Sequence, residues 1–258
     1  MVVFWGILAV LLSLLLALAG LYLVQRLVPL RTRESANTAI GAIYAALYVI
    51  FGITLAFSLY IGRQEVDEVQ QTTEREAGGL ENLYQLADQL PQPKRGEIQA
   101  LDESYLRVVV EEEWPSLEQG GKNQQSTRAE ALMDELQESV LEFEPTTDAE
   151  QTLYSEGVEI VYAVEEEREI RLLEDRQDVH TYLWYLLVVG GVLTVSHAFF
   201  FGTEVLWLHR LSVAALTILV VFLLYATYQV QYPFSGGVRV GSDAYAEALD
   251  GIKAERKR

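Results

Sequence analysis

The chain has 258 residues, of which 50% are hydrophobic, and a formal net charge of -18. This charge argues against nucleic acid as a partner, because binding to phosphates depends on basic side chains. The sequence contains no cysteine, which excludes disulfides, thiolate nucleophiles, zinc fingers and iron–sulfur clusters. Its three histidines lie within or beside apolar segments, so we expect neither an enzyme nor a bound cofactor.

Four segments lack any Asp, Glu, Lys or Arg: residues 1–25, 35–62, 179–203 and 211–238. Each is longer than the roughly 20 residues that a helix needs to cross about 30 Å of hydrocarbon. The sequence therefore predicts an all-α integral membrane protein with four transmembrane helices. The lipid bilayer is its first expected partner.

The acidity is confined to the segment between the second and third predicted spans. Residues 63–178 contain 31 Asp and Glu against 10 Lys and Arg, a net charge of -21, whereas the rest of the chain carries +3. We predict transmembrane helices 1 and 2 within residues 1–62 and helices 3 and 4 within 179–231. The acidic segment 63–178 is predicted to be a helical domain continuous with the flanking spans, and 232–258 a C-terminal tail.

Within the acidic segment, apolar residues recur every three or four positions, which predicts amphipathic helices. The first continues from the second span to about Leu90. The second covers about residues 96–113 and is expected to end at Trp114, because Pro115 lacks an N–H and disfavours helical geometry in the preceding residue. A third helix begins after Ser126 or Thr127 as N-cap, and a fourth leads from about Asp148 to the third span.

Three consecutive glutamates precede Trp114, but they do not form a metal site by themselves. Consecutive residues on a helix point about 100° apart, so Glu111, Glu112 and Glu113 cannot converge on one ion. We interpret the first two as solvent-facing charges. Glu113 is expected to cap or pair with a backbone group or an arginine, and the Trp114 ring to be buried.

The second predicted span carries small residues at helical spacing, together with aromatic and aliphatic residues. Small residues allow two helices to pack closely, which is a purely structural interpretation. In a homo-oligomer the same helix would surround an axis and line a pore, with rings of large side chains as the constriction. The candidate pore-lining residues are Gly41, Tyr44, Ala45, Tyr48, Phe51, Gly52, Leu55, Phe57 and Ser58.

His197 lies inside the third predicted span, close after Thr194 and Ser196. An ionisable side chain within the membrane suggests a functional role, although a histidine hydrogen-bonded to a neighbouring helix is the more common case.

Basic residues give two opposing indications of orientation. Arg26, Arg31 and Arg33 lie between the first two spans, and Arg210 lies between the last two; short basic loops are typical of the cytoplasmic side. Arg63 and the basic C-terminus favour the opposite orientation. We expect a multi-pass protein of the plasma membrane with its acidic domain outside.

Several motifs occur in a fixed order along the chain. Asn37 opens the second span, EREAGGLENLYQLADQLP follows at 74–91, YLRVVVEEEWPSL at 105–117 and YPFSG at 232–236. Over nearly the whole chain, this order resembles the bestrophin-like family of prokaryotic four-span membrane proteins. The resemblance implies structural roles for Asn37, Glu76, Glu113, Trp114, Pro115, Pro233, Phe234 and Gly236.

Because bestrophins are pentameric anion channels, the resemblance implies a homo-oligomeric ion channel, pentameric by analogy, with the second helix lining the pore. A domain with a net charge of -21 would favour cations, so the permeant ion stays open. The alternative is a non-conducting, membrane-anchored binding or sensory protein that acts through its helical domain.

Overall fold

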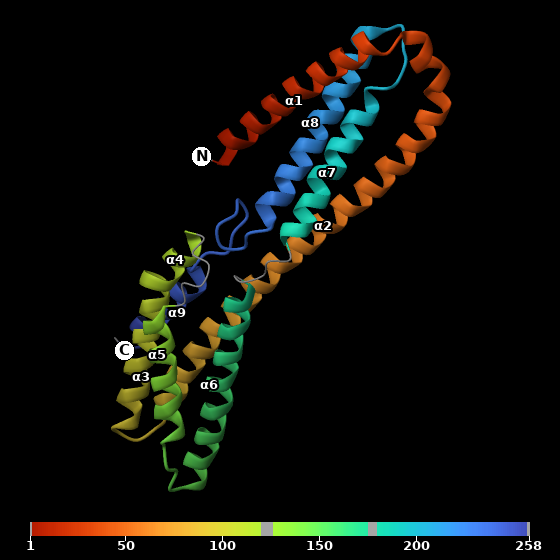
Figure 1. Cartoon of the computed structure of the whole chain (residues 1–258). Coiled ribbons are helices and arrows are strands. Elements are labelled where there is room, and N and C mark those ends of the chain that lie inside the picture. Colours follow the sequence, from red (N-terminus) through yellow and green to blue (C-terminus); the bar gives the residue numbers. More distant parts are fainter. Residues whose placement is uncertain (1, 120–125, 175–179, 257–258) are drawn as a thin grey trace. The chain divides into compact units, whose positions relative to one another are not determined.

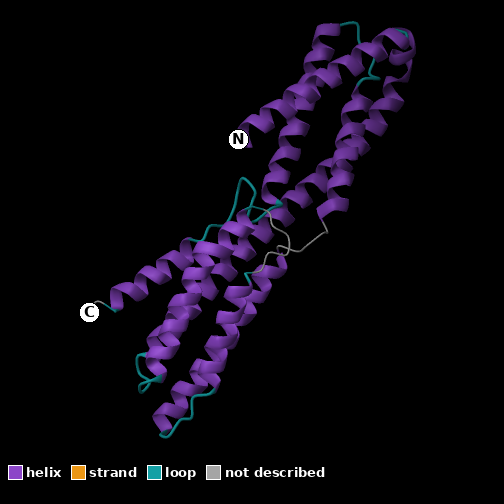
Figure 2. Ribbon diagram, turned by 60° about the vertical axis from the view of Figure 1, so that its left-hand side comes forward, coloured by secondary structure: helices purple, strands orange, loops and turns teal. Residues whose placement is uncertain are grey.

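The computed structural model describes residues 2–119, 126–174 and 180–256, and shows helices joined by turns and loops (Figures 1 and 2). No strand occurs in these ranges, as the all-α prediction requires. The helical elements are α1 (Val2–Leu27), α2 (Leu30–Ala87), α3 (Lys94–Val108), η1 (Val109–Glu113), α4 (Trp114–Glu118), α5 (Thr127–Leu141), α6 (Asp148–Glu174), α7 (His180–Ala198), α8 (Leu206–Val230) and α9 (Asp243–Glu255).

The internal contacts divide the chain into two compact units. Unit 1 comprises Met1–Gln64 and Asp178–Gln231, and unit 2 comprises Glu65–Gln177 and Tyr232–Arg258. The long helix α2 contributes residues to both units. The segment that the sequence suggested to be a tail belongs to unit 2, where α9 is one of the packed helices.

Three of the described helices are long and apolar enough to cross a membrane by length and composition: α1, α2 and α8. The third predicted span corresponds to α7, whose apolar part, Tyr182–Ala198, is shorter than a typical span. Its predicted first residue, Val179, lies outside the described residues. The structure therefore supports a membrane protein with several long apolar helices.

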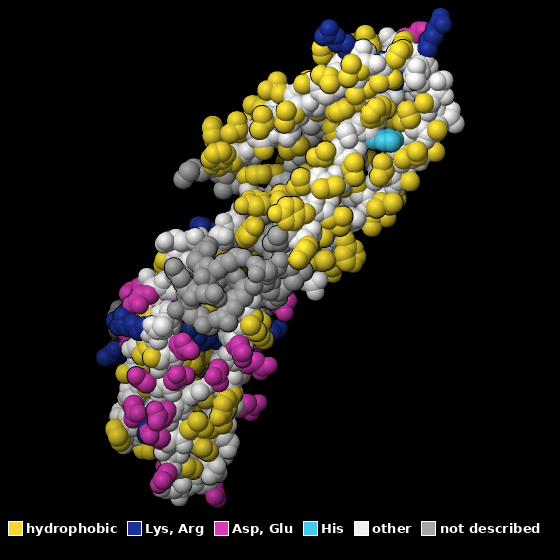
Figure 3. All heavy atoms as spheres, viewed as in Figure 1, with side chains coloured by type: hydrophobic (Ala, Val, Ile, Leu, Met, Phe, Trp, Pro, Cys, Tyr) yellow, Lys and Arg dark blue, Asp and Glu magenta, His cyan; other side chains and the backbone are white. Residues whose placement is uncertain are grey.

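Unit 1 has small internal cores and a largely apolar surface. Phe51 and Leu55 of α2 pack against Leu187 of α7 and Val220 of α8. A second cluster joins α1, the end of α7 and α8, through residues that include Leu21, Phe199 and Val213. Hydrophobic side chains cover the visible face of this unit (Figure 3). Such a surface suits a lipid environment.

Unit 2 has one continuous apolar core and an acidic surface (Figure 3). Fully buried side chains come from all of its larger helices, for example Leu80, Tyr105, Leu136, Val161 and Ile252. Helix α5 begins at the predicted N-cap: the Ser126 hydroxyl accepts a hydrogen bond from the Ala129 N–H at 3.3 Å. The amphipathic pattern of the sequence thus encodes a helical bundle with its apolar faces inward.

The prediction that a helix ends at Trp114 is wrong. Helix α3 passes through the π-helical turn η1 into α4, and the Trp114 N–H bonds to the carbonyl of Val109, five residues earlier. Pro115 then lies in the first turn of α4, where a missing N–H needs no acceptor. The wider π turn therefore lets the chain remain helical across the proline.

Candidate functional site

A group of charged side chains is buried inside unit 2 around Glu76 of α2 and Glu113 of η1. Arg171 of α6 bridges these two glutamates. Its Nε lies 2.8 Å from Glu76 Oε2, and its Nη2 lies 3.0 Å from Glu113 Oε1. All three side chains are fully buried. We refer to Glu76, Tyr105, Glu113, Arg168, Arg171 and Tyr245 as the buried network.

Arg168, one helical turn before Arg171, forms a second and bidentate pair with Glu113. Its Nη1 and Nη2 lie 2.9 Å and 2.8 Å from the two carboxylate oxygens. Two parallel bonds of this kind fix the geometry as well as the charge balance. Two arginines therefore neutralise Glu76 and Glu113, which offsets much of the cost of burying them.

Two tyrosine hydroxyls complete the hydrogen bonding of Glu76. Tyr105 of α3 donates to Oε1 at 2.5 Å, and Tyr245 of α9 donates to Oε2 at 2.8 Å. The Tyr105 oxygen in turn accepts a bond from Arg168 at 2.9 Å. The network consequently joins α2, α3, η1, α6 and α9, which are far apart in the sequence.

Aromatic rings surround Arg171. Its guanidinium lies 5.5 Å from the Trp114 ring centroid and 5.6 Å from that of Tyr245, within cation–π range. Phe234 packs edge-on against Trp114 with centroids 5.6 Å apart. Thus the motif residues Glu76, Glu113, Trp114 and Phe234 meet at one place.

The YPFSG segment turns tightly beside this cluster. The Gly236 N–H donates to the Tyr232 carbonyl at 2.8 Å, and the Val240 N–H donates to the Pro233 carbonyl at 2.9 Å. These bonds hold the segment that carries Phe234. The segment is therefore part of the packing of unit 2.

The electrostatics of the network favour stable ion pairs. Burial opposes ionisation of Glu113, but the charge of Arg171 and the bonds from Arg168 outweigh it and lower the pKa of Glu113. Burial also opposes a charge on Arg171, yet Glu76, Tyr245 and Glu113 raise its pKa. Burial raises the pKa of Tyr105 and Tyr245, which keeps their hydroxyls as donors. These ion pairs are better suited to holding the helices of unit 2 together than to transferring protons.

Sequence reasoning anticipated an arginine as one possible partner of Glu113, but it did not identify Arg168, Arg171, Tyr105 or Tyr245. One signal was available. Arg168 and Arg171 stand one helical turn apart in the glutamate-rich stretch EEEREIR, on a side of α6 that is buried. Basic residues on the buried side of an acidic helix indicate internal ion pairs.

The candidate pore-lining residues fall on two sides of α2. Phe51, Leu55 and Ser58 are buried within unit 1, and Tyr44 is half-buried and stacks on His197 with centroids 6.3 Å apart. Gly41 is partly buried. The residues left exposed are Ala45, Tyr48, Gly52 and Phe57.

His197 is partly buried at the end of α7. Its Nε2 has no hydrogen-bond partner in the part of the chain that the structure describes. The stacking on Tyr44 gives the ring a packing role between α7 and α2.

The remaining motif residue, Asn37, forms a separate clamp within unit 1. Its side-chain amide donates to the Gly202 carbonyl at 2.8 Å, and its side-chain oxygen accepts from the Gly202 N–H at 2.9 Å. Arg33 adds a bond to the Phe201 carbonyl at 3.2 Å. These bonds tie the loop between α7 and α8 to the start of α2.

We expect Gly202→Ala to destabilise this clamp. A Cβ at Gly202 would lie 2.4 Å from the backbone nitrogen of Glu34, and backbone atoms cannot rotate away. The expected loss is about 1–3 kcal/mol or more of unfolding free energy, measured as a lower thermal midpoint in detergent. Gly41→Ala is the control, because its nearest contact would be an ordinary 3.9 Å from Phe201. Equal midpoints for the two variants would contradict the prediction.

No group of three or more His, Cys, Asp or Glu arranged to hold a metal occurs in the described ranges. The architecture is that of a membrane protein with apolar helices and a second helical unit whose helices are joined by the buried network. The chain belongs to the Bestrophin-like domain family, whose model matches residues 11–245. Family membership indicates a channel-like membrane protein, since this family is typically associated with channels rather than enzymes. A comparison with curated proteins gives no match.

Proposed function

We propose that this protein is a subunit of a homo-oligomeric ion channel and that the apolar part of α2 lines the pore. The observation that carries the proposal is the unpartnered face of α2. One side of the helix is fixed to α7 and α8 by Phe51 and Leu55. The other side is exposed and bears mostly small residues at intervals of three and four, interrupted by Val49: Thr38, Ala42, Ala45, Gly52 and Ala56.

Small residues at this spacing allow helices to approach closely. Membership in the Bestrophin-like domain family supports a partner that is another copy of the same helix. Among the sequence candidates, the proposal therefore relies on Ala45 and Gly52, with Tyr48 beside them, all exposed in the single chain. Phe57 is also exposed, but it lies about 140° around the helix from Gly52. Phe51 and Leu55 act in the proposal by holding α2 in place.

The same helix offers a route for regulation. Glu76, which the buried network holds through four hydrogen bonds, lies on α2. A rearrangement of unit 2 would therefore act directly on the helix that contains the proposed pore lining. The proposal treats unit 2 as the gating element.

Ion flux into liposomes that contain the purified full-length protein tests the channel. We expect flux above that of empty liposomes for Cl⁻ or for K⁺, and the comparison of the two identifies the selectivity. Flux equal to the background over a range of pH and Ca²⁺ would instead support the non-conducting, membrane-anchored binding or sensory protein.

Gly52→Leu is expected to abolish flux or disrupt assembly while leaving the subunit folded. A Cβ at Gly52 meets no atom of the described chain within 4 Å, so the substitution begins in open space on the exposed side of α2, where the proposal places another subunit. Ala46→Leu, also exposed on α2 but about 120° around the helix from Gly52, is the matched control. Flux and oligomer size should change only in the first variant; unaltered flux and size in Gly52→Leu would remove this face from the pore.

The proposal includes four spans in the plasma membrane, with α7 as the third. Its 19 residues rise roughly 28 Å as an α-helix, close to the thickness of the hydrocarbon core. Arg26, Arg31 and Arg33 favour a cytoplasmic loop before α2, which would place unit 2 outside. Because the chain has no cysteine, single cysteines introduced into unit 2 can be tested for labelling by an impermeant reagent on intact cells.

A further inference from the structure

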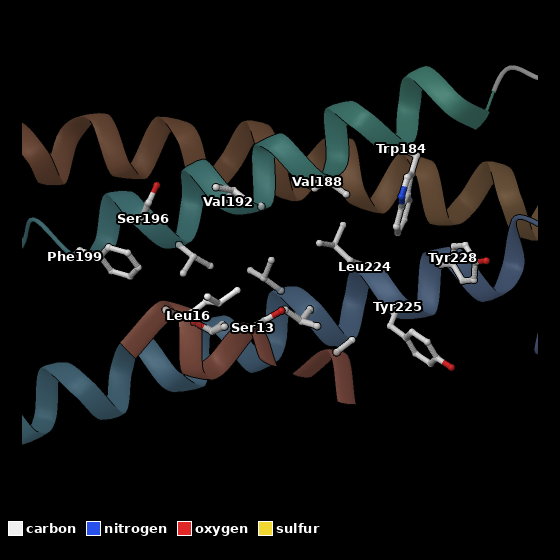
Figure 4. A pocket seen from close by; sticks show the side chains of 17 residues that line it. Ser13, Leu16, Trp184, Val188, Val192, Ser196, Phe199, Leu224, Tyr225 and Tyr228 are labelled. Atoms are coloured by element: carbon white, nitrogen blue, oxygen red, sulfur yellow. The ribbon is translucent and has the colours of Figure 1, made fainter. Parts of the chain in front are cut away.

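A cavity of about 500 Å³ lies within unit 1 between α1, α7 and α8 (Figure 4). Trp184, Tyr225 and Tyr228 lie towards one end of it, and Ser196 and Phe199 towards the other. The cavity is therefore elongated along the helices. It is separate from the buried network and from the exposed face of α2.

Two glycines fix α1 at either end of this cavity. A Cβ at Gly6 would lie 2.9 Å from the Tyr225 ring, and one at Gly20 would lie 2.8 Å from the Phe199 ring. The two positions are about 21 Å apart along the helix axis. Between them, α1 lines the cavity mainly with small residues, Ala9, Ser13 and Ala17, together with Leu16. The aromatic contacts hold the helices together at the ends, and the small side chains leave space between them.

The side chains that line the cavity favour an apolar ligand. The Thr217 hydroxyl donates to the Val213 carbonyl at 2.7 Å, and the Ser196 hydroxyl to the Leu193 carbonyl at 3.2 Å. These hydroxyls are therefore satisfied by their own helices. Most other lining residues are apolar, for example Val188, Val192 and Leu224. The cavity is open on the side where Leu16 and Val192 are largely exposed, so an apolar molecule can enter it and gain packing contacts with its walls.

We propose that this cavity is a binding site for one acyl chain of a membrane lipid. A chain of one leaflet covers about half of the 30 Å hydrocarbon core, which fits within the distance between the two glycines. Trp184 and Tyr228 pack together with centroids 5.6 Å apart at one end. Such amphipathic rings are typical of the membrane–water interface, so the lipid headgroup lies at this end.

Native mass spectrometry of the full-length protein in a mild detergent tests this site. We expect the unmodified protein to retain phospholipid after extensive washing. Combined Ala9→Leu and Ser13→Leu substitutions fill the cavity from α1 and should abolish the retained lipid. Ala19→Leu adds the same side chain at an exposed position of α1 and should retain it. Equal lipid retention by all three proteins, or none by the unmodified protein, would overturn the proposal.

A second measurement does not depend on the folding of any variant. The unmodified protein is reconstituted with a phospholipid that carries a photoreactive group on its acyl chain, and the adducts are mapped. Residues 9–17 and 188–195 should be labelled several-fold more than Leu211 and Phe222, which are exposed on α8 outside the cavity. Equal labelling would count against the site. So would a change in oligomer size in the filled variant without loss of lipid, since a second copy of the chain would then be the occupant.

Discussion

Glu113→Ala is expected to lower the unfolding free energy of unit 2 by about 3–5 kcal/mol. The substitution leaves Arg168 without its bidentate partner and Arg171 with one carboxylate instead of two, both inside the protein. An uncompensated buried charge costs far more than the loss of an exposed pair. Urea unfolding of the full-length protein in detergent, followed by hydrogen exchange of peptides from α3 to α4, measures the loss.

The neighbouring residue provides the matched control. Glu112 pairs with Arg128 at 2.6 Å, but both side chains are substantially exposed. We expect Glu112→Ala to cost no more than about 1 kcal/mol, since surface ion pairs contribute little. High salt should reduce the small effect at Glu112 and leave the effect at Glu113 nearly unchanged. Similar costs for the two variants would mean that the buried network is not the main support of unit 2.

Asp102→Asn is expected to stabilise unit 2 at neutral pH. Asp102 is fully buried on the inner side of α3, and neither carboxylate oxygen has a hydrogen-bond partner among the described residues. Burial raises its pKa well above the ordinary 3.8. The folded protein therefore keeps a proton that the unfolded chain releases. The stability that protonated Asp102 allows is fully present below the pKa of Asp102 in the unfolded chain. It is lost as pH rises towards the higher pKa of Asp102 in the folded protein, by up to about 1.4 kcal/mol per pH unit.

Asparagine has the same shape but does not ionise, so the variant lacks this slope. The unfolding free energies of the variant and the unmodified protein should be similar near pH 4 and diverge progressively towards pH 8. Asp134→Asn, at an exposed position of α5, should leave the pH dependence unchanged. A constant difference between Asp102→Asn and the unmodified protein at every pH would show that Asp102 stays ionised in the folded state.

The helical character of the protein and its apolar segments could be predicted because they depend on local patterns. Charge-free runs identified the apolar helices, and three- to four-residue spacing identified the helices of unit 2, including the cap at Ser126. The family could also be identified, because its motifs are short and contiguous. Each of these signals lies within a few turns of one helix.

The features that escaped prediction depend on contacts between distant segments. Tyr245 reaches Glu76 across 169 residues, and no local pattern in α9 indicates this bond. The membership of residues 232–258 in unit 2 is likewise set by packing, since the apolar run before them gives only the end of a membrane helix. Pro115 was misjudged for another reason: its usual effect on an α-helix does not apply where a π turn precedes it.

The π turn between α3 and α4 has a consequence for comparing members of the family. It acts as a one-residue offset between two helical registers. In an uninterrupted α-helix, residues after Glu113 would be rotated by about 100° relative to their present direction, and Trp114 would no longer face the core in which it is now buried. The length of the segment from Tyr105 to Trp114 therefore carries as much information as its residues. A relative one residue shorter there would need an uninterrupted α-helix in place of the π turn to keep its tryptophan over the arginine.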